Sequence, residues 1–303
     1  MSIHTRTHIR YSKVDIAYSW LFLLPVIIIL FIAALIPLLS GLYLSFHEYK
    51  LNMPSIPMRF VGLGNYVELF KDELFLQSLR NNTIFAFMSV SIEMVLGVLF
   101  AMLLSEDNKL SRGMITIVLI PMVIAPVAAG TLWRMMLDRT YGVINYLLSF
   151  IGISPISWLG DPAVAIYTIV AVDIWQFTPY VTILVLSSIK AIPRSFFESA
   201  RVDGSSSWTL FRRIILPLSS PVIIVVMMLR FIDAFKVFDT IFVMTQGGPG
   251  NATEMLPTYI YQQGIKFFRV GYSSAIAVLF VITMSLVSWG YNKLRALELR
   301  RLD

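Results

Sequence analysis

Four charged side chains recur at every third position within one strongly apolar stretch of the sequence. Residues 218–243 are mostly hydrophobic, yet they contain Arg230, Asp233, Lys236 and Asp239. Positions i and i+3 are neighbours on a helix surface, so the alternating charges could neutralise one another as an ion-pair ladder. A second reading is that this face lines a polar path and offers hydrogen-bond donors and acceptors to a hydroxylated solute. The spacing leaves both readings open.

A second polar cluster precedes a proline in another apolar stretch. Asp173, Trp175, Gln176 and Thr178 are followed by Pro179. Aromatic rings can cover the apolar faces of sugars, while amide, hydroxyl and carboxylate groups hydrogen-bond to sugar hydroxyls. These residues could therefore form a sugar site, or they could serve helix packing and internal hydrogen bonding.

Other kinds of chemistry find no support in the sequence. There is no cysteine, and the three histidines, His4, His8 and His47, have no metal-ligand spacing. No G-x-x-x-x-G-K-S/T run that could bind ATP phosphates occurs, and no catalytic dyad stands out. Glu93 and Arg134, two more ionisable residues in apolar stretches, could be a distant pair or unrelated. The sequence therefore predicts no catalytic residue, no metal site and no cofactor in this chain.

The composition indicates which elements carry these polar groups. The 303 residues are 57% hydrophobic and 14% charged, with a mean hydropathy of +0.76, whereas soluble domains carry about 25% charged residues. A membrane-spanning helix needs about 20 mostly apolar residues. Six stretches qualify: 17–46, 83–104, 114–137, 163–189, 218–243 and 272–291. The first is too long for a signal peptide. We expect one all-α transmembrane domain of six helices over residues 1–303.

The basic residues indicate how these helices are oriented. Six spans place both termini on one side, and we assign that side to the cytoplasm because basic residues then favour it by fourteen to seven. The cytoplasmic group is Arg6, Arg10, Lys13, Lys109, Arg112, Lys190, Arg194, Arg201, Arg212, Arg213, Lys293, Arg295, Arg300 and Arg301, and the outer group is Lys50, Arg59, Lys71, Arg80, Arg139, Lys266 and Arg269. The net charge of +6 therefore indicates topology and not a nucleic-acid partner.

The cytoplasmic segment 190–217 has the sequence of two short helices. Ser195 and Glu198 fit a capping box at the start of the first. Gly204 provides the positive φ with which a helix commonly stops. In the outer segment 138–162, residues 143–148 could form another short helix.

The second helix of this pair is expected at Trp208–Ile215, capped by Ser207 and ended by Leu216 and Pro217 before the fifth span. Aromatic residues and arginines give the helix pair both apolar and charged surface. A compact element of this kind is suited to docking into a groove of a cytoplasmic partner.

The same segment carries a family resemblance. The pattern E-A-A-x(3)-G-x(9)-I-x-L-P is typical of the inner-membrane permeases of binding-protein-dependent ABC importers, and the chain resembles it closely, with serine in place of one alanine. The matching residues are Glu198, Ala200, Gly204, Ile214, Leu216 and Pro217, and Ser199 is the one departure, at the first alanine of the pattern. Asp203 and Phe211 resemble the sugar-importing branch of that family.

Two further segments resemble carbohydrate permeases of the maltose and glycerol-phosphate type. Residues 60–66 read F-V-G-L-G-N-Y, similar to F-x-G-L-x-N-Y, and residues 245–250 carry the T-x-G-G-P turn. The resemblance implies a type I ABC importer transmembrane domain. It also implies that segment 190–217 is a coupling helix pair that inserts into a separate ATPase.

The resemblance implies several partners. These are a second homologous permease subunit, two copies of a cytoplasmic ATPase that bind ATP and Mg²⁺, and an extracytoplasmic solute-binding protein. The solute would be a sugar, oligosaccharide, polyol or glycerol-phosphate-like molecule, and the location a bacterial or archaeal cytoplasmic membrane, where lipid surrounds the spans. A stand-alone secondary transporter and a membrane-embedded enzyme are the alternatives. The first lacks an internal repeat here, and the second lacks an acidic or histidine cluster.

Overall fold

The computed structural model describes residues 13–53, 55, 57–106 and 108–302, so the predictions on His4, His8, Arg6 and Arg10 lie outside it. The α-helices are α1 (Lys13–Leu30), α2 (Ile36–Ser45), α3 (Gly64–Leu69), α4 (Glu73–Leu103), α5 (Lys109–Val123), α6 (Pro126–Met136), α7 (Val143–Ser149), α8 (Ala165–Lys190), α9 (Arg194–Val202), α10 (Ser207–Leu210), α11 (Leu216–Phe235), α12 (Asp239–Met244), α13 (Leu256–Tyr261) and α14 (Val270–Leu302). The π-helical segments are η1 (Phe31–Leu35), η2 (Phe211–Ile215) and η3 (Gln262–Lys266), and strands β1 (His47–Glu48) and β2 (Arg59–Phe60) pair antiparallel.

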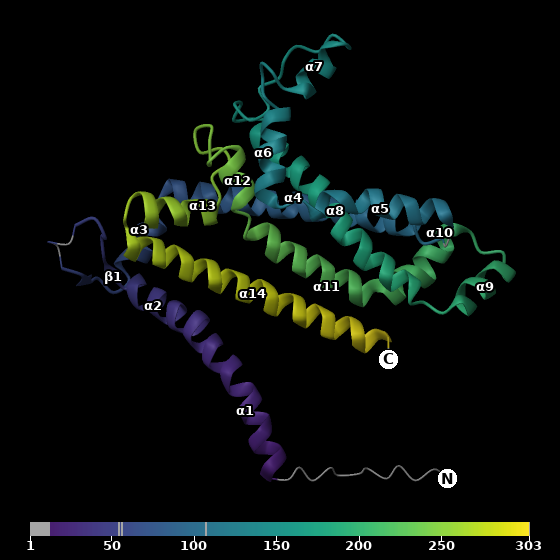
Figure 1. The fold of residues 1–303 in the computed structure, drawn as a ribbon, viewed down its shortest axis with the longest axis horizontal. Helices are drawn as coiled ribbons and strands as arrows, with labels where there is room; N and C mark the ends of the chain where they lie inside the picture. Colours follow the sequence, from purple (N-terminus) through teal and green to yellow (C-terminus); the bar gives the residue numbers. More distant parts are fainter. Residues whose placement is uncertain (1–12, 54, 56, 107, 303) are drawn as a thin grey trace.

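Long apolar helices dominate the molecule (Figure 1). Five stretches of the described residues are long and apolar enough to cross a membrane, and there are six if the bent pair α5 and α6 counts as one span. The five are Trp20–Ser45, Glu73–Leu103, Ala165–Lys190, Ser207–Met244 and Val270–Lys293. The prediction of a helical membrane fold is confirmed at this level.

The second of these helices begins ten residues earlier than predicted, at Glu73, and Asp72 explains why. Its Oδ1 accepts the Leu74 N–H at 2.9 Å and so caps α4. Its Oδ2 accepts the hydroxyls of Tyr259 and Tyr272, which ties α4 to α13 and α14. Burial opposes ionisation, but these hydrogen bonds outweigh it and hold the pKa of Asp72 below its usual value.

The predicted third span, residues 114–137, is broken in two. Helices α5 and α6 meet at 93°. Pro126 opens α6, and because its ring disfavours helical backbone before it, Ala125 is extended with ψ of 138°. The break frees the Ile124 carbonyl, which accepts a hydrogen bond from Gln176 Nε2 at 2.9 Å. The expectation of one continuous helix here is therefore wrong.

Two prolines that could end helices instead follow π-helical segments. Segment η1 precedes Pro37, and η2 precedes Pro217. In η2, the Leu216 N–H donates to the Phe211 carbonyl five residues earlier, and this wider turn accommodates the proline ring that an α-helix would crowd. Helix α10, η2 and α11 are continuous, so the prediction that Leu216 and Pro217 end a helix before the fifth span is wrong.

The core of the bundle lies between α4 and α8, with α11 packed on both. The closest approach is at Gly97 of α4, where a Cβ atom would lie 2.5 Å from Cγ1 of Val181 on α8. Val181 is fully buried at this contact, and Phe85 and Ile169 are fully buried elsewhere along the same two helices. Glycine is therefore required at position 97 because the two helix backbones approach closely.

Gly97→Leu is expected to separate α4 from α8 and to lower thermal stability, since overpacking a close contact costs about 1–3 kcal/mol. Thermal unfolding of the detergent-purified protein measures the change, and adding Val181→Ala should restore part of it. Gly290→Leu on α14 is the matched control, because a Cβ there meets nothing within 4 Å. Equal losses in both variants would contradict the assigned contact.

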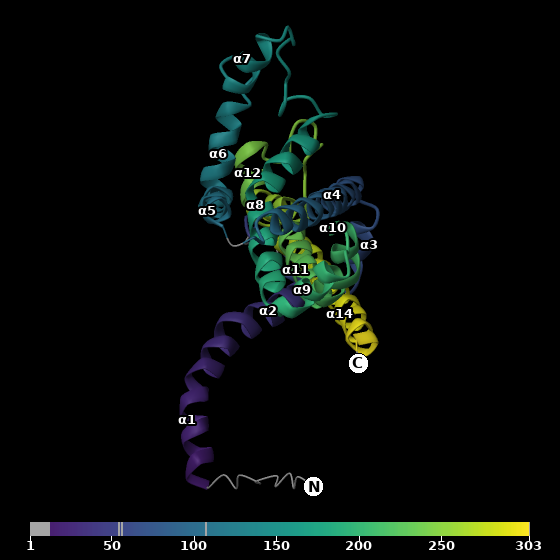
Figure 2. The ribbon, with the colours of Figure 1, turned by 90° about the vertical axis from the view of Figure 1, so that its right-hand side faces the viewer.

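Helices α1 and α2 with η1 form an arm that leaves the bundle at the end carrying β1, α3 and α13, called here the β1 end (Figures 1 and 2). None of the most apolar window of Trp20–Ser45 is buried. Within α2, only Gly41, Leu44 and Ser45 are not exposed, and these last residues lie where α2 packs on α14. The opposite end of the bundle carries α9 and the end of α14 and is called the α9 end.

The segments that join the spans are more ordered than predicted. The segment 47–82, which separates the first two predicted spans, contains the β1–β2 pair, α3 and the beginning of α4. The short helix expected at residues 143–148 is present as α7, which stands away from the bundle beyond α6 (Figure 1). The last predicted outer loop, residues 245–271, contains α13 and η3.

Candidate translocation and coupling sites

Three charged side chains from three different spans meet inside the bundle. Arg230 of α11 donates from Nε and Nη2 to the two carboxylate oxygens of Glu93 on α4, at 2.7 and 2.9 Å. Its Nη2 also donates to Oδ2 of Asp173 on α8 at 3.1 Å. The side chains are 2%, 0% and 3% exposed, in the order Arg230, Glu93, Asp173. We call these three residues the buried triad.

The triad replaces the ladder that the sequence suggested. Lys236 and Asp233 do form an i,i+3 ion pair of 2.9 Å, with half of each side chain exposed. Arg230 instead turns to α4 and α8, and Asp239 lies beyond a break, at the first position of α12. A single four-membered ladder is therefore wrong. Burial favours the bidentate pair with Glu93, because a charge in an apolar interior needs a partner that fills its donors.

Glu93 is the residue of this site that sequence reasoning left without a role. An ionisable side chain within an apolar stretch signals function or pairing, but its partner lies 137 residues away. The suggested distant pair of Glu93 with Arg134 does not form. Arg134 donates to the Val243 carbonyl at 2.9 Å instead.

The polar cluster on α8 surrounds the triad and the α5–α6 break. The Arg230 guanidinium lies 4.0 Å from the Phe177 ring centroid, and Trp175 meets Trp133 of α6 edge to face at 5.3 Å. Two buried polar atoms here, Oε1 of Gln176 and Oγ1 of Thr178, have no hydrogen-bond partner among the described residues. Unpaired buried acceptors and donors are costly. The cluster therefore contains both hydrogen bonds that hold the helices together and buried oxygen atoms that could still accept or donate a hydrogen bond.

The predicted coupling segment folds as two short helices at the α9 end. The first, α9, begins at Arg194 after Pro193, whose side chain makes no cap hydrogen bond. The capping box with Ser195 is therefore wrong: Ser195 lies within the first turn, because Pro193 holds the extended backbone from which the helix starts. The second begins at Ser207, and Ser206 caps it by accepting the Thr209 N–H at 3.2 Å.

The turn between these helices is a Schellman motif. The Gly204 N–H donates to the Arg201 carbonyl at 3.1 Å, and the Ser205 N–H donates to the Ala200 carbonyl at 2.9 Å. Gly204 has φ of 64°, so the predicted left-handed stop is confirmed. A Cβ at Gly204 would meet nothing within 4 Å. Backbone conformation, and not space, thus requires glycine here.

The other residues of the coupling motif lie around this turn. Glu198, Ser199 and Asp203 are exposed, while Ala200 is 6% exposed. A cleft of about 420 Å³ separates α9 from α10 and η2. Its lining includes Ser199, Ala200, Asp203, Leu210 and Ile214. Phe211 stacks near Trp208, with ring centroids 5.6 Å apart, and Leu216 and Pro217 belong to α11.

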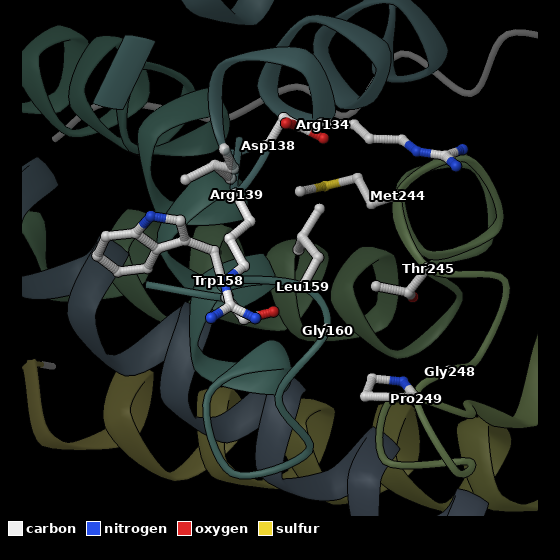
Figure 3. A pocket seen from close by; sticks show the side chains of 12 residues that line it. Arg134, Asp138, Arg139, Trp158, Leu159, Gly160, Met244, Thr245, Gly248 and Pro249 are labelled. Carbon is white, nitrogen blue, oxygen red and sulfur yellow. The ribbon is translucent and has the colours of Figure 1, made fainter. Parts of the chain in front are cut away.

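A pocket of about 400 Å³ opens where α6, α12 and the segment before α8 meet (Figure 3). Figure 3 shows Arg134 beside α12 and Arg139 beside Trp158 and Gly160. Asp138 also lines the pocket, but its Oδ1 accepts the N–H groups of Thr140 and Tyr141, each at 2.8 Å. These backbone hydrogen bonds hold the pKa of Asp138 below its usual value. The Asp138 carboxylate thus hydrogen-bonds to the backbone of its own turn. Arg134 and Arg139 have no acidic partner among the described residues.

The described residues contain no group of three or more histidine, cysteine, aspartate or glutamate side chains that could hold a metal ion. The buried triad has two carboxylates, and both are occupied by Arg230. Chemically, the arrangement offers hydrogen-bonding groups inside the bundle and an exposed pair of short helices at the α9 end.

Comparison with known proteins places these features in one family. Residues 93–296 match the family described as binding-protein-dependent transport system inner membrane component. The trehalose/maltose transport system permease protein MalF of Thermococcus litoralis is 37% identical over 290 residues, which cover 94% of this chain and 95% of MalF.

Solved structures agree with this similarity. A bacterial ABC transporter involved in the import of the acidic polysaccharide alginate contains a chain with a TM-score of 0.82 and 26% identity, covering 93% of this chain and 97% of that one. A bacterial alginate ABC transporter in complex with an alginate pentasaccharide-bound periplasmic protein gives a TM-score of 0.81 and 26% identity, covering 92% and 95%. The chain therefore belongs to the family of binding-protein-dependent transport system inner membrane components.

Proposed function

We propose that this chain is a permease subunit of an ATP-driven ABC importer for a carbohydrate-like solute. The observation that carries the proposal is the α9–α10 helix pair with its Schellman turn at Gly204, an exposed element at one end of a bundle of membrane spans. The solute class is supported by the trehalose/maltose and alginate relatives. A sugar, oligosaccharide, polyol or glycerol-phosphate-like molecule fits the polar groups near the triad.

The energy source in this proposal is a separate ATPase. ATP and Mg²⁺ bind to two copies of that subunit, and this chain is a translocation subunit and not an enzyme. Closure of the ATPase pair moves α9 and α10 through residues Glu198, Ser199, Ala200, Asp203, Gly204, Phe211, Ile214, Leu216 and Pro217. Because α10, η2 and α11 are one continuous helix, displacement of the coupling element passes directly into a span that carries Arg230.

The topology follows from the same proposal. With α5 and α6 counted as one span, a single permease domain over residues 1–303 crosses the inner membrane of a bacterium or archaeon six times. Both termini and α9 lie in the cytoplasm, and the β1 end faces outward. The excess of basic residues on the α9 side supports this orientation.

The candidate solute path runs beside the buried triad. Asp173, Gln176, Thr178 and Arg230 are buried within the chain in this conformation, whereas Trp175 is half-buried. The unpartnered atoms of Gln176 and Thr178 support a role in binding hydroxyl groups. The same path has exposed charges at the end of α11 and the start of α12, provided by Asp233, Lys236 and Asp239. Alternating access would expose the cluster first to one side and then to the other.

Two further partners complete the importer. A second, homologous permease subunit packs against the exposed arm, and the remaining lipid-facing surface contacts the membrane. An extracytoplasmic binding protein delivers the solute to the β1 end. The Figure 3 pocket supports such docking, since Arg134 and Arg139 present positive charge that an acidic side chain of the binding protein can meet.

Reconstitution into liposomes tests the proposal. The chain alone should move no sugar, whereas the chain with its second permease, ATPase and binding protein should import it and hydrolyse ATP. Arg139→Glu should lower binding-protein-stimulated hydrolysis about tenfold through one repulsive contact at the docking surface. Lys293→Glu is the control, because Lys293 is an exposed basic residue of α14 toward the α9 end, away from the side at which the binding protein docks.

Solute movement by the chain alone would favour a secondary transporter and would overturn the proposal. If the binding protein stimulates ATP hydrolysis equally in Arg139→Glu and the wild type, the pocket does not belong to the docking surface, while the rest of the proposal stands.

A further inference from the structure

The end of the α1–α2 arm is completed by side chains from α3. Asn65 donates from Nδ2 to the Ser45 carbonyl at 2.8 Å and to the His47 carbonyl at 2.9 Å. Tyr66 donates from its hydroxyl to Ser45 Oγ at 2.8 Å, and Ser45 Oγ donates to the Leu42 carbonyl at 2.7 Å. The last carbonyls of a helix have no partner within that helix. Asn65 provides a partner for the Ser45 carbonyl, while Tyr66 holds the Ser45 side chain, and we call Asn65 and Tyr66 the arm clamp.

The clamp is buried although it lies near the surface end of the bundle. Asn65, Ser45 and His47 are 6%, 0% and 8% exposed. Both amide hydrogens of Asn65 are used on carbonyl oxygens that water cannot reach, so a side chain without those donors would leave the two carbonyls unpaired. The residue type is therefore specified by hydrogen bonding and not by size alone.

Contacts with α14 hold the chain just beyond the arm. The Gly271 N–H donates to the Tyr49 carbonyl at 3.2 Å, and the Leu51 N–H donates to the Phe268 carbonyl at 3.0 Å. A Cβ at Gly271 would lie 2.0 Å from the His47 carbonyl oxygen, so the two backbones touch. These contacts fix the position at which the arm begins.

The direction of the arm depends on the C-terminal part of α2, which packs on α14, because the residues before it are exposed. Residues 36–40 of α2 are all exposed, and α1 extends away from every other helix (Figure 2). The stretch Trp20–Ser45 has 26 residues, so at 1.5 Å per residue it is about 39 Å long, and a 10° change at its base moves its far end by about 7 Å.

We propose that Asn65 and Tyr66 are positioning residues that set the direction of the arm and thereby the pairing of this chain with the second permease subunit. The inference rests on the proposed function, which provides that subunit. It assigns a physical role to the segment Phe60–Tyr66, whose sequence pattern is otherwise unexplained. A displacement of several ångströms at the far end of the arm removes complementarity with a partner, since packed helices tolerate little misfit.

Distance measurements on the intact chain test the clamp. The sequence has no cysteine, so Leu23→Cys on α1 and Val281→Cys on α14, both at exposed positions, accept the only two nitroxide labels. In nanodiscs, Asn65→Asp should broaden or shift the label distance by about 5 Å or more, as the lever length implies. Asn52→Asp is the matched control, because Asn52 is exposed and lies between β1 and β2.

Retention of the partner tests the consequence. When the chain is co-expressed with the second permease and the ATPase, Asn65→Asp, which removes the hydrogen bonds to the Ser45 and His47 carbonyls, should retain about tenfold less second permease than the wild type, equivalent to ~1.4 kcal/mol of pairing free energy. Tyr66→Phe, which removes one hydroxyl, should act in the same direction and more weakly. If Asn65→Asp does not fold, the label distance and the retention of the second permease are measured on Tyr66→Phe instead, and these results test the proposal.

An unchanged label distance would overturn the clamp, and a changed distance with full retention of the partner would overturn its role in pairing. Failure of the wild-type chain to retain any second permease would instead count against the proposed function, while the label distance would still test the clamp on the chain alone.

Discussion

Arg230→Met is expected to prevent the bundle from folding stably. The substitution leaves Glu93 and Asp173 facing each other inside the membrane without their shared cation. Removing one partner of a buried ion pair costs about 3–5 kcal/mol, which corresponds to a decrease in melting temperature on the order of 10 °C for a chain of this size. Thermal unfolding of the purified protein in detergent, together with its yield from the membrane, measures the loss.

The matched control for Arg230→Met lies on the same helix. Lys236→Met removes the cation of an ion pair whose side chains are 53% and 51% exposed, and such pairs contribute about 0–1 kcal/mol. The combined variant with Arg230→Met, Glu93→Gln and Asp173→Asn carries no charge at the site and should recover part of the lost stability. Similar melting temperatures for Arg230→Met and Lys236→Met would show that the triad is not a stabilising element.

Gly204→Pro is expected to separate ATP hydrolysis from solute import. Proline fixes φ near −65°, whereas Gly204 needs φ of 64°, and the substitution also removes the N–H that donates to Arg201. The Schellman turn would then be lost, and with it the fixed orientation of α9 relative to α10. We expect solute-stimulated hydrolysis by the assembled importer to fall at least about tenfold, equivalent to ~1.4 kcal/mol of coupling, while membrane insertion is unchanged.

Two variants make this prediction specific. Gly204→Asn should retain most activity, because asparagine tolerates the left-handed conformation better than other residues with a Cβ. Gly152→Pro replaces another glycine of positive φ, 78°, in the turn after α7, and should leave coupling intact. Normal transport by Gly204→Pro would refute the assignment of this turn to coupling.

Local constraints explain why much of the fold is predictable from the sequence. The thickness of a bilayer demands long apolar stretches, so the positions of the spans follow from composition. The stop at Gly204 follows from a backbone angle that few other residues adopt. The break before Pro126 also has a local cause, yet the partner of the freed Ile124 carbonyl, Gln176 of α8, lies 52 residues away and could not be read from the sequence.

Contacts between distant segments explain what could not be predicted. The three-residue spacing on α11 favoured a ladder, but spacing cannot show that Arg230 faces α4 and α8 once the helices cross. Glu93 was visible as a charge in an apolar stretch and had no identifiable partner until the fold placed it 2.7 Å from Arg230. Pro217 likewise reads as a helix end, because the sequence gives no sign of the π-helical turn that accommodates it.

The anchoring of the arm has a consequence for the order of events during synthesis. The ribosome completes the arm well before two groups that hold its base: the Gly271 N–H that donates to Tyr49, and the Tyr272 hydroxyl, which reaches Asp72 across 200 residues. Until then the arm rests in lipid, which is as apolar as its own leucines and imposes no penalty. A ribosome that stops before α14 would thus release a chain whose arm has no fixed direction, so completion of α14 decides when the arm becomes oriented.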